Sequence, residues 1–307
     1  YILKSINLNK QDYIALNILG LIYNSLKENS KAKEIFEKAI QINPNYFPSY
    51  NNYGNCLQNL NKIDAALINF KKAYELNNNF EEAINNTANI YTIQGKYEEA
   101  IKYYNVALKI GGETAKIYYN IGVAFSFMKD FDKAEKFYIK SQNINPNDDI
   151  LKKNFAILYL AKQNYKKAWL YYDGRLNLQD FSAKNSSFDN IKNNLWKGEN
   201  ISRDAKILII KEQGIGDEII FSSMYNDAIN KFPNCKIETE PRLLPMFKRV
   251  FNNEKNFVSY RHYSSKIDEI KKFDKILYAG SLGRLFRNNL NDFPKTNFLF
   301  QKKDDLK

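Results

Sequence analysis

The sequence predicts an α-helical repeat solenoid followed by part of a parallel α/β domain. Two columns of residues recur every 34 positions without slippage, and this period is typical of stacked helical hairpins. One column is small (Gly20, Gly54, Ala88, Gly122, Ala156) and the other is alanine (Ala32, Ala66, Ala100, Ala134, Ala168). After residue 175 the period is lost, and short β-branched runs alternate with amphipathic segments. That alternation predicts strands and helices of a parallel sheet.

Two largely aromatic columns keep the same period: Phe36, Phe70, Tyr104, Tyr138, Tyr172 and Tyr23, Leu57, Tyr91, Phe125, Tyr159. Small residues that let two helices touch, with aromatics between repeats, resemble the tetratricopeptide repeat. Pro44 and Pro146 stand where that repeat closes its second helix, although the third repeat has Gly111-Gly112 there. The resemblance implies a domain of residues 1–175, with five repeats from residue 13 after the end of an earlier one. We therefore expect a protein or peptide partner on its concave surface.

A further column consists of asparagines at the sixth position of the first helix of each repeat. Its members are Asn52, Asn86, Asn120 and Asn154, and Ile18 interrupts it. Amides both donate and accept hydrogen bonds, so the column predicts a ladder for an extended peptide backbone. It resembles the asparagine ladder of the O-linked N-acetylglucosamine transferases. The chain is rich in asparagine, so composition is the alternative explanation.

The composition indicates a soluble chain of about two domains, with 44% hydrophobic and 26% charged residues among 307. No apolar run is long enough to span a membrane. The net charge of +12 is spread over both halves of the chain, so we expect no nucleic-acid partner. Cys56 and Cys235 form neither a disulfide framework nor a metal cluster, and His262 is the only histidine. We expect no metal site and a cytoplasmic location.

Residues 176–204 are rich in Asn, Ser and Lys and predict a linker, and residues 205–307 predict the α/β domain. Strands are expected at 206–210, 235–240, 256–260 and 275–278, and helices at 217–232 and 242–251. The first of these helices should bury one face, made of Ile219, Ile220, Met224, Ala228 and Ile229. Regular alternation predicts a parallel sheet that is covered on both faces.

A glycine turn, Gly214-Ile215-Gly216-Asp217, joins the first strand to this helix. A dinucleotide site is disfavoured, because Ile219 replaces the third glycine and the carboxylates of Glu212 and Asp217 would repel phosphates. Asp217 keeps two interpretations. Its carboxylate can cap the helix N-terminus, or it can act as a general base at the strand's C-terminal end, where α/β sheets bind ligands.

Three motifs in this half resemble bacterial proteins that fuse tetratricopeptide repeats to a GT-B glycosyltransferase domain, and more distantly the heptosyltransferases. They are Trp196-x-Gly198-Glu199, the Glu-Gln-Gly-x-Gly-Asp string at 212–217, and Gly280-Ser281-Leu282. The resemblance implies that residues 205–307 are the N-terminal Rossmann-like half, which holds the acceptor. The nucleotide-sugar donor would bind a C-terminal half beyond Lys307, so this fragment should be inactive alone.

The same resemblance implies an inverting, metal-independent transferase without a cofactor. Asp217 is then the candidate base and Glu212 its alternate. The residues near the substrate would be Gln213, Gly214 and Gly216. Arg284 and Arg287 lie beyond the predicted strand end near Gly280-Ser281, where they would also be near the substrate as cations for an anionic ligand; a solvated surface is the alternative that we expect more. Two functions stay open: transfer of a sugar to a protein or glycan acceptor recruited by the repeats, or a non-catalytic adaptor that binds proteins. Fold analogy alone does not separate them.

Overall fold

A computed structural model describes residues 9–177, 191, 194–212 and 214–295 of the chain. The chain divides into two compact units, Tyr1–Asn147 and Asp148–Lys307. The first unit is built from helix pairs, and the second combines a helix pair with a four-stranded parallel sheet. At this level the predicted combination of a helical solenoid and a small parallel sheet is confirmed.

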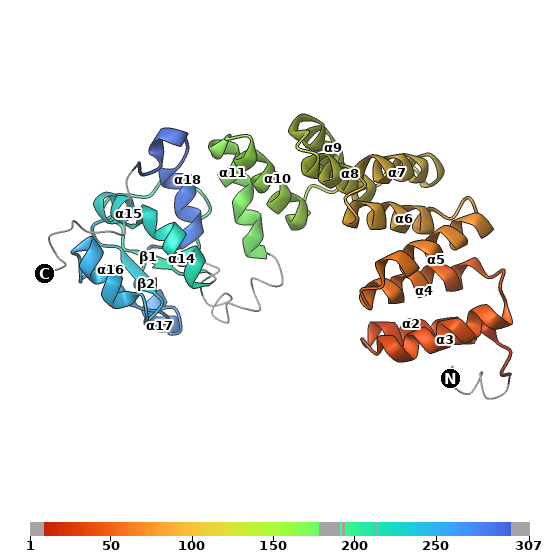
Figure 1. Cartoon of the computed structure of the whole chain (residues 1–307). Coiled ribbons are helices and arrows are strands. Elements are labelled where there is room, and N and C mark those ends of the chain that lie inside the picture. The colour runs from red at the N-terminus through yellow and green to blue at the C-terminus, as the bar shows by residue number, and fades with distance from the viewer. Residues whose placement is uncertain (1–8, 178–190, 192–193, 213, 296–307) are drawn as a thin grey trace, which may run out of the picture. The chain divides into compact units, whose positions relative to one another are not determined.

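Helices of the first unit follow one another as pairs (Figure 1). The pairs are α2 (Tyr13–Ser25) with α3 (Asn29–Ile42), α4 (Phe47–Asn59) with α5 (Ile63–Leu76), α6 (Glu81–Ile93) with α7 (Tyr97–Gly111), and α8 (Ala115–Phe127) with α9 (Phe131–Ile144). Each pair occupies one 34-residue period, as the sequence predicts. Neighbouring pairs also contact each other, so each repeat buries apolar surface that it could not bury alone.

The small and aromatic columns meet inside each pair, as expected. A Cβ atom on Gly54 would come within 2.5 Å of the Phe70 ring, and one on Gly122 within 2.4 Å of the Tyr138 ring. The alanine column is fully buried in all five repeats. Because carbon atoms pack at about 3.5–4 Å, a larger residue in the small column of these repeats would push the two helices apart.

The turn inside each repeat has one residue in the left-handed conformation. These residues are Lys27, Asn61, Gly95, Lys129 and Gln163, with φ between 55° and 75°. The amide that follows donates to a carbonyl five residues earlier, as from Asp130 to Phe125 at 3.0 Å. This bond satisfies an otherwise unpaired carbonyl at the end of the first helix and defines a Schellman motif.

The second unit contains the fifth helix pair, α10 (Asp149–Ala161) and α11 (Tyr165–Tyr172), followed by the 3₁₀ turn η1 (Asp173–Asn177). Its strands are β1 (Ile207–Ile210), β2 (Lys236–Thr239), β3 (Phe257–Ser259) and β4 (Lys275–Tyr278). All pairings are parallel, in the order β3-β2-β1-β4. The remaining helical segments are α14 (Ile215–Phe221), η2 (Ser222–Met224), α15 (Tyr225–Lys231), α16 (Leu244–Phe251), α17 (Ile267–Ile270), η3 (Ala279–Leu282), α18 (Gly283–Phe286) and η4 (Leu290–Asp292).

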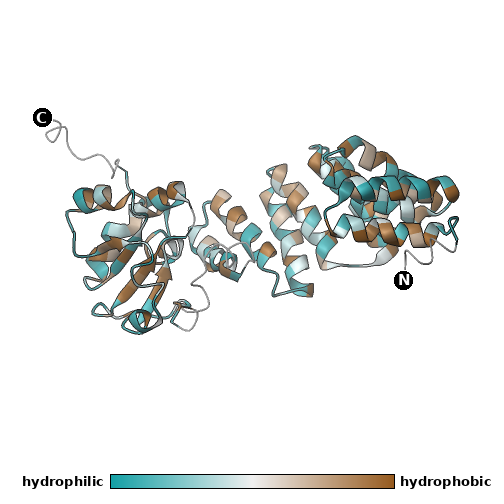
Figure 2. Cartoon of the chain, turned by 90° about the horizontal axis from the view of Figure 1, so that it is seen from below, coloured by the Kyte–Doolittle hydropathy of each residue, from teal (hydrophilic) through white to brown (hydrophobic). Residues whose placement is uncertain are grey.

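Both faces of the sheet are covered, as the sequence predicts. Side chains alternate along a strand, so Ile207 and Ile209 of β1 pack in one cluster with Tyr225 of α15. Leu208 and Ile210 pack on the other face with residues that include Leu176. Figure 2 shows hydrophobic stretches in the sheet, and β1 is apolar and buried at all four positions, which is typical of a parallel strand covered on both sides.

The single helix predicted at 217–232 is wrong. It is interrupted by η2, where the hydroxyl of Ser222 donates to the carbonyl of Ile219 at 2.7 Å. A serine hydroxyl competes for backbone groups and so disturbs a helix interior. The predicted buried face is also wrong at Ile220, which is 66% exposed. Most of the predicted linker, at residues 178–190 and 192–193, lies outside the described residues.

Candidate functional site

The asparagine column lies on the first helices of the repeats and forms a side-chain network. Three of its amides donate from Nδ2 to an amide Oδ1 on the preceding first helix: Asn52 to Asn17 at 3.0 Å, Asn86 to Asn51 at 2.9 Å, and Asn120 to Asn89 at 3.0 Å. The network therefore ties α2 to α4, α4 to α6, and α6 to α8. These bonds fix the orientation of each amide.

The donors of this network keep an unused acceptor. Asn52, Asn86 and Asn120 are half-buried, and no described residue donates to their Oδ1 atoms. Packed helices lie about 8–10 Å apart, which is roughly three residues of an extended peptide at about 3.3 Å per residue. The three amides can therefore meet one peptide backbone at regular intervals.

The fourth member of the column behaves differently. Asn154 lies on α10 in the second unit, and its Nδ2 donates to the carbonyl of Ile150 on the same helix at 2.9 Å. Ile18, which interrupts the column, is 41% exposed on α2. The acceptors Asn17, Asn51 and Asn89 were not singled out from the sequence. The 34-residue step from Asn17 to Asn51 was the available signal.

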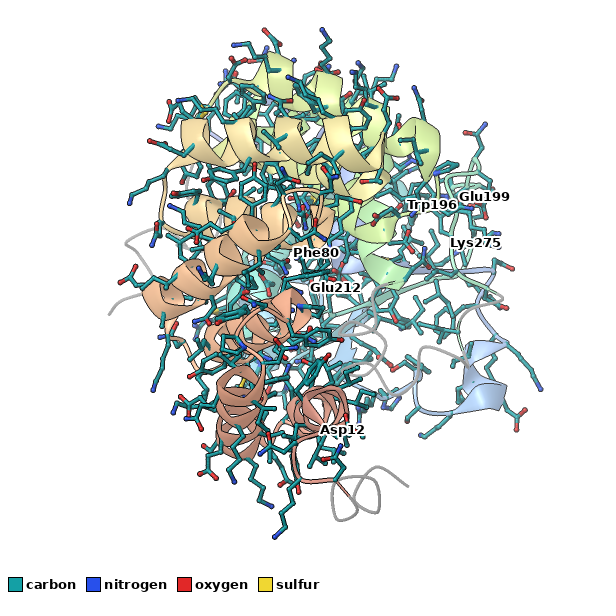
Figure 3. The ribbon with its side chains drawn as sticks, turned by 90° about the vertical axis from the view of Figure 1, so that its right-hand side faces the viewer. Asp12, Phe80, Trp196, Glu199, Glu212 and Lys275 are labelled. Carbon is teal, nitrogen blue, oxygen red and sulfur yellow. The ribbon has the colours of Figure 1, made fainter. Side chains whose placement is uncertain are left out.

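A buried ion pair occupies the carboxyl end of β1. Glu212 accepts two bonds from Arg175 of η1, from Nε at 2.9 Å and from Nη2 at 2.6 Å. The Gly280 amide also donates to Glu212. Burial by itself lowers the pKa of Arg175, but the charge and hydrogen bonds of Glu212 outweigh it and raise that pKa, so the guanidinium stays charged. The Glu212 carboxylate, labelled in Figure 3, is thus held by hydrogen bonds from Arg175 and Gly280.

Asp217 lies close by in the first turn of α14. It is half-buried, and its carboxylate makes no hydrogen bond or ion pair with any described residue. The cap interpretation is wrong, because Gly214 is the N-cap residue and no side chain caps this helix. Gly214 and Gly216 are exposed, and a Cβ on either would meet nothing within 4 Å. Gln213 lies outside the described residues.

The two arginines expected near the substrate differ in their surroundings. Arg287 is only 4% exposed, and it donates to the carbonyl of Ser223 at 2.6 Å and pairs with Asp227 at 2.8 Å. The expectation of a solvated surface fails here, because this guanidinium is buried by its internal partners. Arg284 is half-buried, lies 5.2 Å from the Trp196 ring centroid and donates to the Lys197 carbonyl.

Three glutamates hold segments at this side of the sheet: Glu218 after β1, Glu238 within β2 and Glu240 after β2. Glu238 is buried and accepts bonds from the Arg261, Tyr263 and Ser264 amides. Glu218 is 3% exposed and accepts the Glu240 amide at 3.0 Å. Burial raises the pKa of Glu218, whereas a hydrogen bond from Lys211 lowers that of Glu240. These carboxylates are held by structural contacts, whereas Asp217 makes no hydrogen bond or ion pair with any described residue.

Comparison with known proteins identifies the helical part. Profiles of the tetratricopeptide repeat match residues 13–46, 35–68, 88–126 and 115–148. The chain therefore carries tetratricopeptide repeats. Protein FlbA of Caulobacter vibrioides is 28% identical over 118 residues, which are 34% of this chain and 20% of FlbA. The matched segment thus spans a fifth of that relative.

Two solved structures share the repeat fold. One is PilF of Pseudomonas aeruginosa, with a TM-score of 0.50 and 24% identity, covering 54% of this chain and 77% of that chain. The other is PilW, described as a widely conserved type IV pilus biogenesis factor, with a TM-score of 0.54 and 21% identity over 58% and 83%. At these identities the likeness concerns the fold alone.

Two features are absent from the part of the chain that the structure describes, a membrane-spanning helix and a metal-binding cluster. No described helix is both long enough and apolar enough to cross a bilayer. No three His, Cys, Asp or Glu side chains within the described ranges are placed to hold a metal ion. Both predicted free cysteines are buried, Cys56 in the first unit and Cys235 in the second.

Proposed function

We propose that this chain is a protein-binding adaptor whose repeats hold an extended segment of a partner protein. The tetratricopeptide repeats support a protein-binding function more directly than they support glycosyl transfer. The main support for this proposal is the row of half-buried side-chain amides at Asn52, Asn86 and Asn120. Each amide is oriented by a hydrogen bond to the first helix of the preceding repeat, and no described residue donates to its Oδ1 atom. Backbone amides of a peptide are the natural donors to such a row.

A partner recognised through its backbone needs little sequence specificity. Each neutral hydrogen bond contributes about 1 kcal/mol net, so three amides supply only part of a useful affinity. Exposed apolar residues of the first helix in the array supply more contact surface. Ile14, Ile18 and Leu21 are each at least 40% exposed on α2, and burying apolar area contributes about 25 cal/mol per Å².

The test is a screen of immobilised peptides followed by titration of the best binder. Replacing Asn52, Asn86 and Asn120 together by alanine should weaken binding by about 2–3 kcal/mol, roughly 30- to 150-fold. The matched control replaces three exposed asparagines outside the network, Asn78, Asn105 and Asn143. Equal loss in both triple variants, or no peptide binding by the whole chain, would contradict the proposal.

We propose glycosyl transfer by a longer protein as a second function, with Asp217 as the base. The supporting observation is that Asp217 has no partner among the described residues, whereas Glu212 and Glu218 are held by hydrogen bonds. A general base must be free to accept a proton at the reacting hydroxyl. The nucleotide-sugar donor and a protein or glycan acceptor belong to this same proposal.

The second function is tested in a chain extended beyond Lys307. Asp217→Asn should lower turnover by about 10²- to 10⁴-fold while leaving the melting temperature unchanged, because Asp217 makes no bond in the described part. Asp204→Asn is the matched control, because it makes the same change at an exposed carboxylate that precedes β1. Full activity of Asp217→Asn would remove this residue from the mechanism. If the extended chain bound no sugar nucleotide, the adaptor function would be the only proposal that remains.

A further inference from the structure

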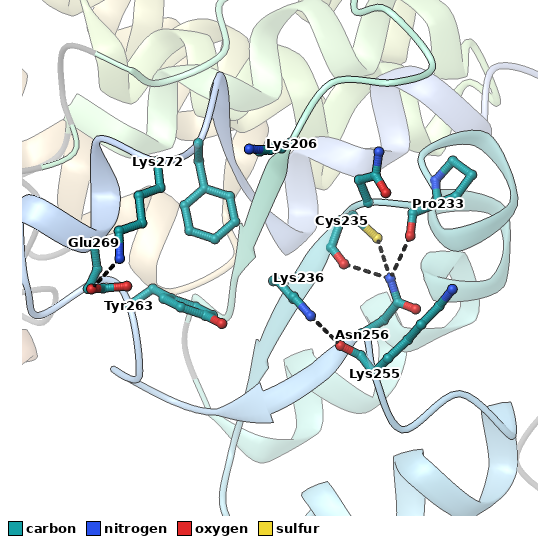
Figure 4. A pocket seen from close by; sticks show the side chains of 11 residues that line it. Lys206, Pro233, Cys235, Lys236, Lys255, Asn256, Tyr263, Glu269 and Lys272 are labelled. Carbon is teal, nitrogen blue, oxygen red and sulfur yellow. Dashed lines mark hydrogen bonds and ion pairs between the residues drawn. The ribbon is translucent and has the colours of Figure 1, made fainter.

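A pocket of about 440 Å³ lies at the amino ends of the strands, at the opposite edge of the sheet from the glycine turn (Figure 4). Every strand contributes to it from the residues that precede or begin it: Lys206 before β1, Cys235 and Lys236 at β2, Lys255 before β3, and Phe273 before β4. Its volume is that of a site for a small molecule. Neither proposed function uses it.

The lining is strongly basic, with four lysines and one glutamate. Lys272 pairs with that glutamate, Glu269, at 2.6 Å. Lys236 donates from Nζ to the Lys255 carbonyl, also at 2.6 Å. The ammonium groups of Lys206 and Lys255 have no acidic partner among the described residues. A cleft lined by one sign of charge concentrates ligands of the other sign.

The carbonyl ends of α15 and α17 point to this edge of the sheet and offset part of the positive charge. Lys236 is already used by a carbonyl, and Lys272 by a carboxylate. The positive charge that remains without a partner is that of Lys206 and Lys255. Lys206 and Lys255 line the pocket from different sides (Figure 4), and their combined positive charge attracts a phosphate, which carries more than one negative charge, more strongly than a single carboxylate.

The walls of the pocket are held firmly. The Asn256 side chain is buried, and its Nδ2 donates to the carbonyls of Cys235 at 2.6 Å and Pro233 at 3.3 Å. Tyr263 packs edge-on against Phe273, with ring centroids 5.1 Å apart. One wall is thus polar and fixed, and the other is aromatic. This combination suits a ligand with a charged end and a flat apolar part.

We propose that this pocket binds a phosphorylated small molecule, with the positive charge of Lys206 and Lys255 attracting its phosphates and the rest of the ligand against Tyr263 and Phe273. The proposal is independent of the repeat surface and of Asp217, which lies at the other end of β1. Since the lysines are close to solvent, binding should weaken as salt rises.

The experiment is calorimetric titration of the whole purified chain with pyrophosphate and with ADP at low and high salt. We expect both to bind, ADP more tightly, and we expect Lys206→Gln and Lys255→Gln each to weaken binding about tenfold. Lys248→Gln on α16 is the matched control, because Lys248 lies outside the pocket. Circular dichroism melts of all variants verify that they fold.

Three results would overturn the proposal. One is no heat of binding for either probe at millimolar concentration and low salt. Another is an equal loss of affinity in Lys248→Gln, which would mean that overall charge and not the pocket attracts the probes. The third is pyrophosphate binding as tightly as ADP, which would show that the aromatic wall takes no part in holding the ligand.

Discussion

At the scale of single residues, Glu218 gives a prediction about pH. Burial raises its pKa above the ordinary value of 4.5, so the folded protein binds this proton more tightly than the unfolded chain does. The free energy of unfolding should therefore fall as pH rises from about 4.5 through the raised pKa. Glu218→Gln cannot lose a proton, and its free energy of unfolding should fall less over this range in urea titrations.

Glu240 is the natural control for that measurement, because its pKa shifts the other way. Lys211 lowers the pKa of Glu240, so its stabilising contribution is present above about 4.5 and is lost as pH falls through the lowered pKa. Glu240→Gln should therefore flatten the acid side of the profile. If Glu218→Gln and the parent chain gave parallel profiles above pH 4.5, the buried proton of Glu218 would not contribute.

Sequence patterns found some site residues and missed others for a physical reason. The asparagine column was visible because its members share one period, and the structure orients three of them alike. The pairing of Arg175 with Glu212 was not visible, because 37 positions separate them and no repeat links them. Asp217 was placed beside its strand correctly, but the cap belongs to Gly214 because the helix begins two residues earlier than predicted.

At the scale of secondary-structure elements, the turns inside the repeats give a second prediction. Lys129 is held at φ 61°, where a side chain costs about 1–2 kcal/mol relative to glycine. Glycine offsets part of this gain, because its unfolded chain is more flexible and ordering it costs about 0.5–1 kcal/mol more free energy. Lys129→Gly should therefore raise the free energy of unfolding by about 0.5–1 kcal/mol, measured by urea titration.

The matched controls use the same chemistry elsewhere. Lys136→Gly removes a lysine from the interior of α9 and should destabilise by about 1 kcal/mol. Gly95→Lys, at the equivalent turn of the third repeat with φ 75°, should destabilise as well. Stabilisation of all three variants, or of none, would mean that the left-handed turn does not determine these values.

The strand and helix predictions show where local patterns suffice. Four strands were found at their predicted places because β-branched runs bounded by turns are strong local signals. The interruption of the helix at η2 depends on one serine hydroxyl that turns back to its own backbone. Such a bond leaves the hydrophobic pattern unchanged, so a periodicity argument cannot detect it.

At the scale of the whole molecule, the fifth helix pair gives a third prediction. It continues the 34-residue period of the array, yet it belongs to the compact unit that contains the sheet. The 34-residue period reflects the packing of each helix on the next one along the chain. Which compact unit a helix belongs to depends instead on its contacts with residues far away in the sequence. Trp169 shows such contacts: its Nε1 donates to the Arg287 carbonyl, and its ring lies against Gly283.

A polypeptide of residues 148–307 should therefore fold cooperatively, whereas one of residues 178–307 should not. The shorter piece leaves Glu212 buried without Arg175, and breaking a buried pair costs about 3–5 kcal/mol. It also exposes the apolar surface that Trp169 covers. Thermal melts followed by circular dichroism and tryptophan fluorescence check this, and equal melting temperatures for the two polypeptides would contradict it.

The amide network also gives the repeat surface a direction. Asn52, Asn86 and Asn120 all send their hydrogen toward the preceding repeat, so their dipoles point the same way and do not cancel. A row of parallel dipoles looks different from its two ends, as a peptide chain does. A partner segment laid along the row in one direction would then meet a different field from the same segment laid in the opposite direction, so the surface would favour one N-to-C direction of the bound polypeptide.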